Sequence, residues 1–242
     1  GILIKIETLK MVFKLYYSIG SQPSRAVLAL SSLLSVELEK IPVNLFAGEH
    51  HSQEFAKLNP MKTVPVLDHD GLVLHESHTI MKYLCNIQGV SDPYYPSDPK
   101  QRAQVDQYLD WFHIKLRDPI AGVYGPLLYE KSGKNEFIKV WKKGINNQEL
   151  YSQMTSEGLS YLNTQLQDVD FLVNNSLTLA DLSLALTVET LRVIRYDFSP
   201  YPNVERWVTS VVEHPAHKPF GDEYKAAVKA REKQTTDSSS DK

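Results

Sequence analysis

The sequence predicts a two-domain protein, an α/β domain followed by an all-α domain, and three observations support this. Residues 11–89 alternate strand and helix patterns in the order strand, helix, strand, short helix, strand, strand, helix. Residues 100–231 carry helical patterns and no convincing strand. Residues 90–99 between them hold three prolines, a composition typical of a linker. We expect residues 1–10 to be an extension or an expression remnant before a natural start at Met11, and the polar residues 232–242 to be disordered.

The first domain should open with a strand at Val12–Tyr17. A polar turn follows, and then a helix from Ser24 to about Leu34 that is apolar nearly all round and should therefore be buried. Glu37–Val43 should form a second strand, parallel to the first because a helix crosses over between them. A loop at Asn44–Ser52 and a short amphipathic helix complete this half of the domain.

The stretch from Asn59 to Leu84 predicts a hairpin and a helix. Two apolar runs, Val64–Leu67 and Leu72–Leu74, flank a segment that ends in Asp-Gly, a strong hairpin signal. Pro65 suits an edge, a strand start or a cis bond that would turn the backbone of Val64 outward. Ser77 stands where a helix N-cap is expected, and a helix N-terminus favours a carboxylate ligand. Together these features suit a small-peptide binding site; the alternative is a plain strand end and a plain helix cap.

Further along, helical patterns run from Lys100 to about Tyr129, with breaks near Pro119, Gly125 and Pro126. Later helices are expected at Glu136–Gln167, Leu179–Ile194, Val204–Glu213 and about Ala216–Arg231. Thr178 and Asp181 have the spacing of a capping box, so we interpret Asp181 as structural. The nearly apolar helix behind this box should form the core of the second domain.

Composition excludes several classes of function. The chain has 29 acidic and 26 basic residues, a net charge of −3, and nothing in this balance favours nucleic acid or an anionic membrane. No apolar run approaches the roughly 20 residues of a membrane span. A single cysteine, Cys85, excludes an internal disulfide and any metal site that needs two thiolates. Its place beside an apolar helix face predicts a small core residue, and the presence of only one cysteine fits a reducing compartment.

Several motifs, in this order, resemble those of the cytosolic glutathione transferases. They are Gly20-Ser21-Gln22-Pro23-Ser24-Arg25, Gly48-Glu49-His50, Asn59 to Pro65, Glu76-Ser77, Arg102 to Asp106 and Thr178 to Asp181. The resemblance covers Met11 to Arg231 and implies a thioredoxin-like first domain and an all-helical second domain. The Gly-Ser-x-Pro turn and the Gly-Glu-His loop look most like the theta and delta classes, in which a serine activates the glutathione sulfur.

The resemblance implies that Ser21 donates a hydrogen bond to the glutathione thiolate. A free thiol has a pKa near 8.5, and lowering it toward 7 requires about 2 to 3 kcal/mol, which one or two charge-assisted hydrogen bonds can supply. Tyr16 and Tyr17 are rival donors, since other classes use a tyrosine near this strand end. Cys85 lies in the wrong place, which argues against the classes that reduce mixed disulfides.

The resemblance also assigns the groups that would hold glutathione. Val64, before Pro65, should pair its backbone with the cysteinyl part. Glu76 and Ser77 should hold the γ-glutamyl end, and His50 and Lys62 the glycyl carboxylate. The Gly-Glu-His match selects His50 over His51, while His69 should be solvated in the hairpin turn. His78 is a further candidate, because the delta class has a basic residue at this position. Asp106 is another, since its counterpart reaches across a dimer to the glutathione amine. The alternative for Asp106 is a solvated acid on a helix.

The electrophile pocket should lie between the Ser18–Gly20 turn and the first long helix, with Ile19, Arg117, Ile120 and Tyr124 as candidate walls. The expected function is transfer of the glutathione thiolate to small hydrophobic electrophiles (halides, epoxides, activated alkenes or peroxides), for detoxification in the cytoplasm. Glutathione is a co-substrate, and no metal or redox cofactor, nucleic acid or membrane partner is implied. A homodimer is the expected active unit. The alternatives are a non-catalytic ligand-binding or interaction module, and a glutathione-dependent isomerase or dehalogenase.

Overall fold

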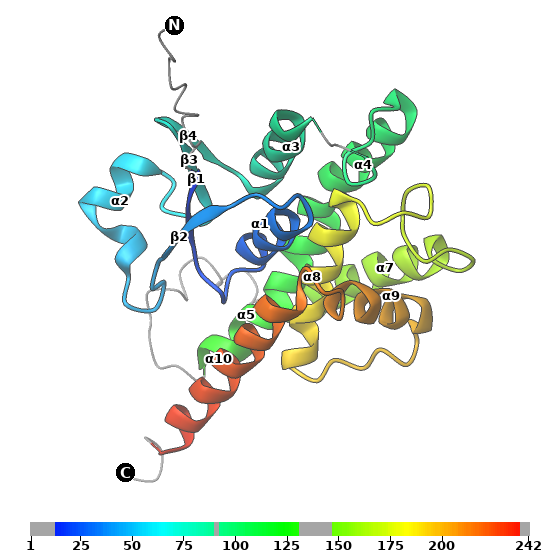
Figure 1. Ribbon diagram of the computed structural model, residues 1–242. Helices are drawn as coiled ribbons and strands as arrows, with labels where there is room; N and C mark the ends of the chain where they lie inside the picture. The colour runs from blue at the N-terminus through cyan, green and yellow to red at the C-terminus, as the bar shows by residue number, and fades with distance from the viewer. Residues whose placement is uncertain (1–12, 90–91, 131–146, 238–242) are drawn as a thin grey trace, which may run out of the picture.

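The computed structural model describes residues 13–89, 92–130 and 147–237. Its first part is a four-stranded mixed sheet with helices around it, and its second part is helical (Figure 1). The elements of the first part are β1 (Phe13–Tyr17), α1 (Gln22–Leu33), β2 (Leu38–Pro42), η1 (Glu49–His51), α2 (Gln53–Leu58), β3 (Val66–His69), β4 (Leu72–His75) and α3 (Ser77–Gln88). Those of the second part are α4 (Pro99–Phe112), η2 (His113–Arg117), α5 (Asp118–Glu130), α7 (Gln148–Gln165), α8 (Leu179–Val193), α9 (Pro202–Val212) and α10 (Lys218–Asp237). The predicted order of elements and fold class are confirmed.

The sheet has the strand order β2-β1-β3-β4. β1 and β2 are parallel, as the crossover helix predicts, whereas β3 is antiparallel to both β1 and β4. Tyr16 lies opposite Ile41 and Val66, and Val66 lies opposite His75. The carboxyl ends of β1, β2 and β4 therefore meet the amino end of β3 at one edge of the sheet.

The β3–β4 hairpin turns at Asp70-Gly71, whose φ angles of +50° and +91° suit the Asp-Gly pair. β3 begins at Val66, two residues later than predicted, and continues through His69. The prediction that His69 is solvated in the turn is wrong. Its Nδ1 lies 2.6 Å from the hydroxyl of Tyr83, and its ring packs on Phe13.

The first long helix of the second part is interrupted at η2, a π-helical segment between α4 and α5. Pro119 explains the place of the break, because its ring cannot tolerate the carbonyl of Lys115 in ordinary helical position. That carbonyl approaches α7 instead, where a Cβ on Gly158 would lie 2.7 Å from it. α5 runs on through Gly125 and Pro126, so the breaks predicted there are wrong.

The C-terminal prediction also needs correction. α10 extends to Asp237, beyond the end at residue 231 that the sequence suggested, so residues 232–237 are helical rather than disordered. A helix is also predicted at Glu136–Gln167. Its predicted start lies outside the described residues, and within them the corresponding helix, α7, begins at Gln148.

α8 forms the core of the helical part, as predicted. Every residue from Leu179 to Leu191 is buried. The Asp181 carboxylate accepts hydrogen bonds from the backbone N–H of Thr178 (2.9 Å), the backbone N–H of Leu172 (3.0 Å) and the indole N–H of Trp207 (2.9 Å). Asp181 therefore ties the start of α8 to the preceding loop and to α9, which confirms its structural role.

α1 packs directly on α8, and this contact joins the two parts of the molecule. α10 packs against α1 at the same junction (red in Figure 1), and its Tyr224 hydroxyl lies 2.9 Å from that of Tyr124 on α5. Cys85 is fully buried on α3, and burial raises the pKa of its thiol to about 12. Within the described residues, no helix is long and apolar enough to cross a membrane.

Candidate glutathione site

The predicted glutathione residues come from segments that converge on one edge of the sheet. Ser21 follows β1, His50 follows β2, Val64 precedes β3, and Glu76 and Ser77 follow β4. The strand register brings these four chain segments together, although they are far apart in sequence. An edge of this kind can contact an extended tripeptide along its whole length.

Ser21 ends a tight turn and caps α1. Its backbone N–H donates to the carbonyl of Ser18 (2.9 Å), and its Oγ accepts from the backbone N–H of Ser24 (3.4 Å). The cap uses a lone pair of the oxygen, so the hydroxyl hydrogen is left to donate to an incoming anion. The positive end of the α1 dipole lies at the same place. Both features would stabilise an anion placed beside Ser21.

The two rival tyrosines face different surroundings. Tyr16 packs edge-on against Phe55 of α2, with ring centroids 6.4 Å apart. Tyr17 packs against the main core, where burial and the charge of Glu223 raise the pKa of its phenol. A phenol with a raised pKa is a weaker hydrogen-bond donor to a thiolate. These surroundings favour Ser21 as the donor.

The Val64–Pro65 peptide bond is cis, one of the three arrangements that the sequence suggested. The β3 ladder begins at Val66. In the described part of the chain, no hydrogen bond engages the backbone N–H or C=O of Val64. Both groups therefore remain able to pair with a peptide ligand.

His50 and His51 of η1, together with Lys62 from the loop between α2 and β3, form a basic cluster. His50 and His51 stack with ring centroids 3.9 Å apart. Burial lowers the pKa of His50, and the charges of His51 and Lys62 lower it further. Lys62 is exposed, and the Asn59 side chain braces its loop by donating to the carbonyl of Thr63 (2.9 Å). Such a cluster suits a carboxylate.

The N-cap of α3 lies one residue earlier than predicted. Ser77 is the first helical residue, and Glu76 occupies the N-cap position with a left-handed φ of +70°. The prediction that Ser77 is the N-cap is wrong, because the chain turns into the helix at Glu76. A non-glycine residue held at positive φ costs about 1 to 3 kcal/mol and is typical of functional sites. Ser77 still presents its hydroxyl and free N–H at the helix N-terminus.

Next to this terminus, His78 lies between the rings of Phe112 and His113, with centroids 5.2 Å and 4.8 Å away. Burial, with the positive charges of His113, Lys82 and Arg117, lowers the pKa of His78 to about 3. His78 is therefore neutral at physiological pH. It could contact glutathione only as a neutral hydrogen-bond partner.

Asp106 has partners within its own chain. Lys82 lies 2.6 Å from its Oδ1, and the Tyr95 hydroxyl donates to both carboxylate oxygens at 3.3 Å and 3.2 Å. Asp106 is therefore not the freely solvated acid of the alternative interpretation. Its contact across a dimer stays a prediction.

The predicted walls of the electrophile pocket are only partly brought together. Ile19 and Tyr124 are both half-buried and are linked indirectly through Arg25 and Tyr224. Arg25 donates to the Ile19 carbonyl (3.0 Å), and the Tyr124 and Tyr224 hydroxyls lie 2.9 Å apart. Ile120 is fully buried in the core, so its prediction as a pocket wall is wrong.

Arg117, predicted as a wall of the electrophile pocket, lies within electrostatic range of Glu76 at the start of α3. Its side chain reaches solvent, but the surrounding protein desolvates it and lowers its pKa, while Glu76 and Asp118 act in the opposite direction. The same arginine lowers the pKa of His113, which burial also lowers. The π-helical segment η2 carries both His113 and Arg117.

The sequence interpretation missed two parts of this region. In the sequence Arg25 appears only as the last residue of the Gly20–Arg25 motif, and Tyr224 lies on α10, for which the sequence predicts no role. Their contacts join positions about 200 residues apart in the chain, and no local pattern signals such a pairing.

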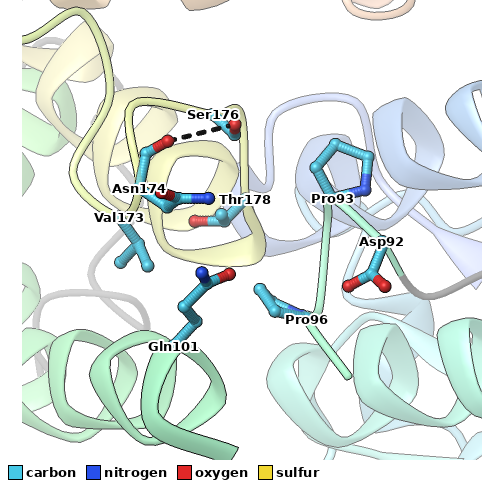
Figure 2. Close-up of a pocket in the computed structure, with 8 residues that line it drawn as sticks. All are labelled: Asp92, Pro93, Pro96, Gln101, Val173, Asn174, Ser176 and Thr178. Carbon is cyan, nitrogen blue, oxygen red and sulfur yellow. Dashed lines mark hydrogen bonds between the residues drawn. The ribbon is translucent and has the colours of Figure 1, made fainter. Parts of the chain in front are cut away.

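A separate cavity lies between the linker, the start of α4 and the loop before α8 (Figure 2). It is lined by Asp92, Pro93, Pro96, Gln101, Val173, Asn174, Ser176 and Thr178. None of these is a predicted glutathione residue. In the described part of the chain no three His, Cys, Asp or Glu side chains are grouped to hold a metal ion.

Comparison with known proteins identifies the family. A model of the glutathione S-transferase N-terminal domain matches residues 11–86, and one of the C-terminal domain matches residues 151–215. A delta-class glutathione transferase of Nilaparvata lugens is 32% identical with a TM-score of 0.75, over 90% of this chain and 99% of that one. An epsilon-class enzyme of the housefly Musca domestica is 30% identical with a TM-score of 0.72, over 90% and 98%. A diazinon-metabolizing glutathione S-transferase of the silkworm Bombyx mori is 29% identical with a TM-score of 0.75, over 90% and 99%.

These relatives match both the sheet that carries the candidate site and the helical part behind it. The theta assignment stays a prediction, since the relatives named here with a class are delta and epsilon enzymes. The chain belongs to the glutathione S-transferase family and is similar to its delta-class members.

Proposed function

We propose that the protein transfers the glutathione thiolate to small hydrophobic electrophiles, with Ser21 as the hydrogen-bond donor to the sulfur. The observation that carries this proposal is the Ser21 hydroxyl itself. It is fixed as the N-cap of α1, at the sheet edge where the other predicted glutathione residues converge.

The chemistry requires a stabilised anion and a positioned partner. One hydrogen bond to a charged group contributes about 1.5 to 3 kcal/mol, and 1.36 kcal/mol corresponds to one pKa unit. Ser21 and the α1 dipole can therefore lower the pKa of the bound thiol by roughly one to two. The thiolate then attacks an electrophile held beside it, and proximity supplies much of the remaining rate.

Three parts of the tripeptide are bound by different groups of residues. The backbone of Val64, before Pro65, pairs with the cysteinyl residue. Glu76 and Ser77 take the γ-glutamyl ammonium and carboxylate, and His50 and Lys62 take the glycyl carboxylate. His78 stands beside the γ-glutamyl end as a neutral neighbour. No metal or redox group takes part in this scheme.

The active unit in this proposal is a cytoplasmic homodimer, in which Asp106 of one subunit approaches the glutathione amine of the other. Ile19, Tyr124 and Arg117 border the electrophile. The silkworm relative is described as diazinon-metabolizing, so activated organophosphate esters join halides, epoxides, activated alkenes and peroxides as substrates to test.

Turnover on such a panel tests the proposal. We expect glutathione-dependent conjugation of at least one electrophile, and a fall of about 10²-fold in kcat for Ser21→Ala, equivalent to about 2.7 kcal/mol. Glutathione binding without turnover of any panel member would instead support the non-catalytic binding module. If the products are isomerised or dehalogenated instead, the assigned glutathione residues stay the same and only the reaction assigned to the pocket changes.

A further inference from the structure

The guanidinium of Arg25 is a fully buried group that the proposed chemistry does not use. Arg25 lies on the second turn of α1 and has no solvent exposure. Its Nη1 donates to the carbonyl of Ile19 (3.0 Å), and its Nη2 donates to Oε2 of Glu189 on α8 (3.3 Å). The ring of Tyr224 on α10 covers it, 3.7 Å from the guanidinium carbon. One side chain thus connects the turn after β1 with two helices of the second part.

Stability alone is a poor explanation for this arrangement. A buried ion pair is often no more stabilising than apolar residues of the same volume, because both charges must be desolvated. Here the Arg25 Nε and the Glu189 Oε1 are buried without a hydrogen-bond partner among the described residues. A group retained at that cost is expected to specify a particular geometry.

The carbonyl that Arg25 holds belongs to the turn that presents Ser21. The Ser21 N–H donates to the Ser18 carbonyl, so residues 18–21 form one closed turn with Ile19 inside it. One helical turn before Arg25, the Gln22 side chain donates to the carbonyl of Ser183 on α8 (2.9 Å). The start of α1 is thereby fixed to α8 at two points, Gln22 and Arg25, both just after the Ser21 cap.

We propose that Arg25 is a positioning residue for the transferase reaction: held by Glu189 and Tyr224, it fixes the Ile19 carbonyl and so sets the place of the Ser21 hydroxyl relative to the glutathione sulfur. This inference rests on the proposed function. Glu189 neutralises the charge of Arg25, so the guanidinium acts through the hydrogen bond to Ile19 rather than through its field at the sulfur. Misplacement by 1 Å can cost about 10²-fold in rate.

An arginine suits this role because its planar fork can donate to two acceptors while its face stacks on an aromatic ring. A lysine keeps the charge but offers a single ammonium that cannot maintain all three contacts. Arg25→Lys is therefore the informative variant. The matched control is Arg206→Lys, since Arg206 also joins backbone carbonyls (Leu166, 2.7 Å) to a carboxylate (Asp170, 2.6 Å), but on α9, at a site with no link to the Ser21 turn.

The measurement is the ultraviolet titration of the thiol of bound glutathione, with kcat and KM for glutathione measured alongside. For Arg25→Lys we expect the pKa of the bound thiol to rise by about one, and kcat to fall about tenfold to a hundredfold, with KM for glutathione within about twofold of the natural protein. Arg206→Lys should leave the thiol pKa and kcat unchanged. If Arg25→Lys only lowers the melting temperature, as a structural residue would, and leaves the thiol pKa of the folded protein unchanged, the proposal is overturned.

Tyr224→Leu provides a second variant in case Arg25→Lys does not fold. It removes the ring that covers the guanidinium and should raise the thiol pKa in the same direction by a smaller amount; no change would count against the proposal. Ser21→Ala distinguishes a failure of thiol activation by Ser21 from a failure of the positioning role of Arg25. If it leaves the thiol pKa unchanged, activation by Ser21 fails and the role of Arg25 fails with it. If it raises the thiol pKa while Arg25→Lys does not, only the positioning role is refuted.

Discussion

Acid should destabilise the protein through His78, and the structure gives the size of this effect. The pKa of His78 is lowered to about 3, whereas an unfolded histidine titrates near 6.5. Between these values the unfolded chain binds a proton that the folded chain excludes, so stability falls as pH decreases. The contribution of His78 is fully present above pH 6.5 and is lost progressively toward pH 3.

A pH of 5.0 lies about 1.5 units below the pKa of an unfolded histidine. At 1.36 kcal/mol per unit, the free energy of unfolding therefore falls by about 2 kcal/mol at this pH. The side chain is partly exposed, so the expected effect is about 1 to 2 kcal/mol. His78→Gln keeps a polar side chain between Phe112 and His113 but removes the titration. The free energy of unfolding should therefore decrease by about 1 to 2 kcal/mol less in this variant than in the natural protein between pH 7.5 and 5.0.

Urea titrations at the two pH values, at one fixed protein concentration, measure this difference. His75→Gln is the control, because it makes the same substitution at an exposed position on β4. An identical pH dependence in His78→Gln and the natural protein would refute the explanation by burial, and would mean that His78 is charged or solvated.

Other predictions concern stability, binding and reactivity. Asp181→Ala should lower the free energy of unfolding by about 3 to 5 kcal/mol in a urea titration, because it leaves several buried donors without an acceptor, while exposed Asp168→Ala should cost less than about 0.5. A smaller loss at Asp181 would contradict the assigned network. Lys62→Ala should raise KM for glutathione by about fivefold with kcat nearly unchanged, and Lys57→Ala should change neither; an unchanged KM would remove Lys62 from the site. Cys85, with its pKa of about 12, should react with iodoacetamide at pH 8 only after unfolding, so rapid labelling of the native protein would disprove its burial.

The sequence predicts the architecture well because that architecture depends on local patterns. Alternating apolar residues, the Asp70-Gly71 turn and the Thr178–Asp181 capping box each specify an element without reference to distant contacts. The order of these elements then leaves few topologies, and the parallel β1–β2 pair follows from one crossover.

Boundaries and side-chain environments are harder to predict, since tertiary contacts decide them. His69 looked like a turn residue, but it pairs with Phe13 and Leu72 in the sheet, and its ring contacts Tyr83. Ile120 was predicted as a pocket wall from its place on the first long helix, yet the fold buries its side chain in the core. Arg25 and Glu189 lie 164 positions apart, so only the folded chain reveals that they meet.

The most direct test is the ultraviolet titration of glutathione bound to the natural protein, to Ser21→Ala and to Tyr17→Phe. We expect the pKa of the bound thiol to lie about one to two below its free value near 8.5 in the natural protein and in Tyr17→Phe, and to return toward that value in Ser21→Ala. A lowered thiol pKa that persists in Ser21→Ala but is lost in Tyr17→Phe would contradict the assignment to Ser21. An unshifted pKa in the natural protein, despite tight binding, would contradict thiol activation altogether.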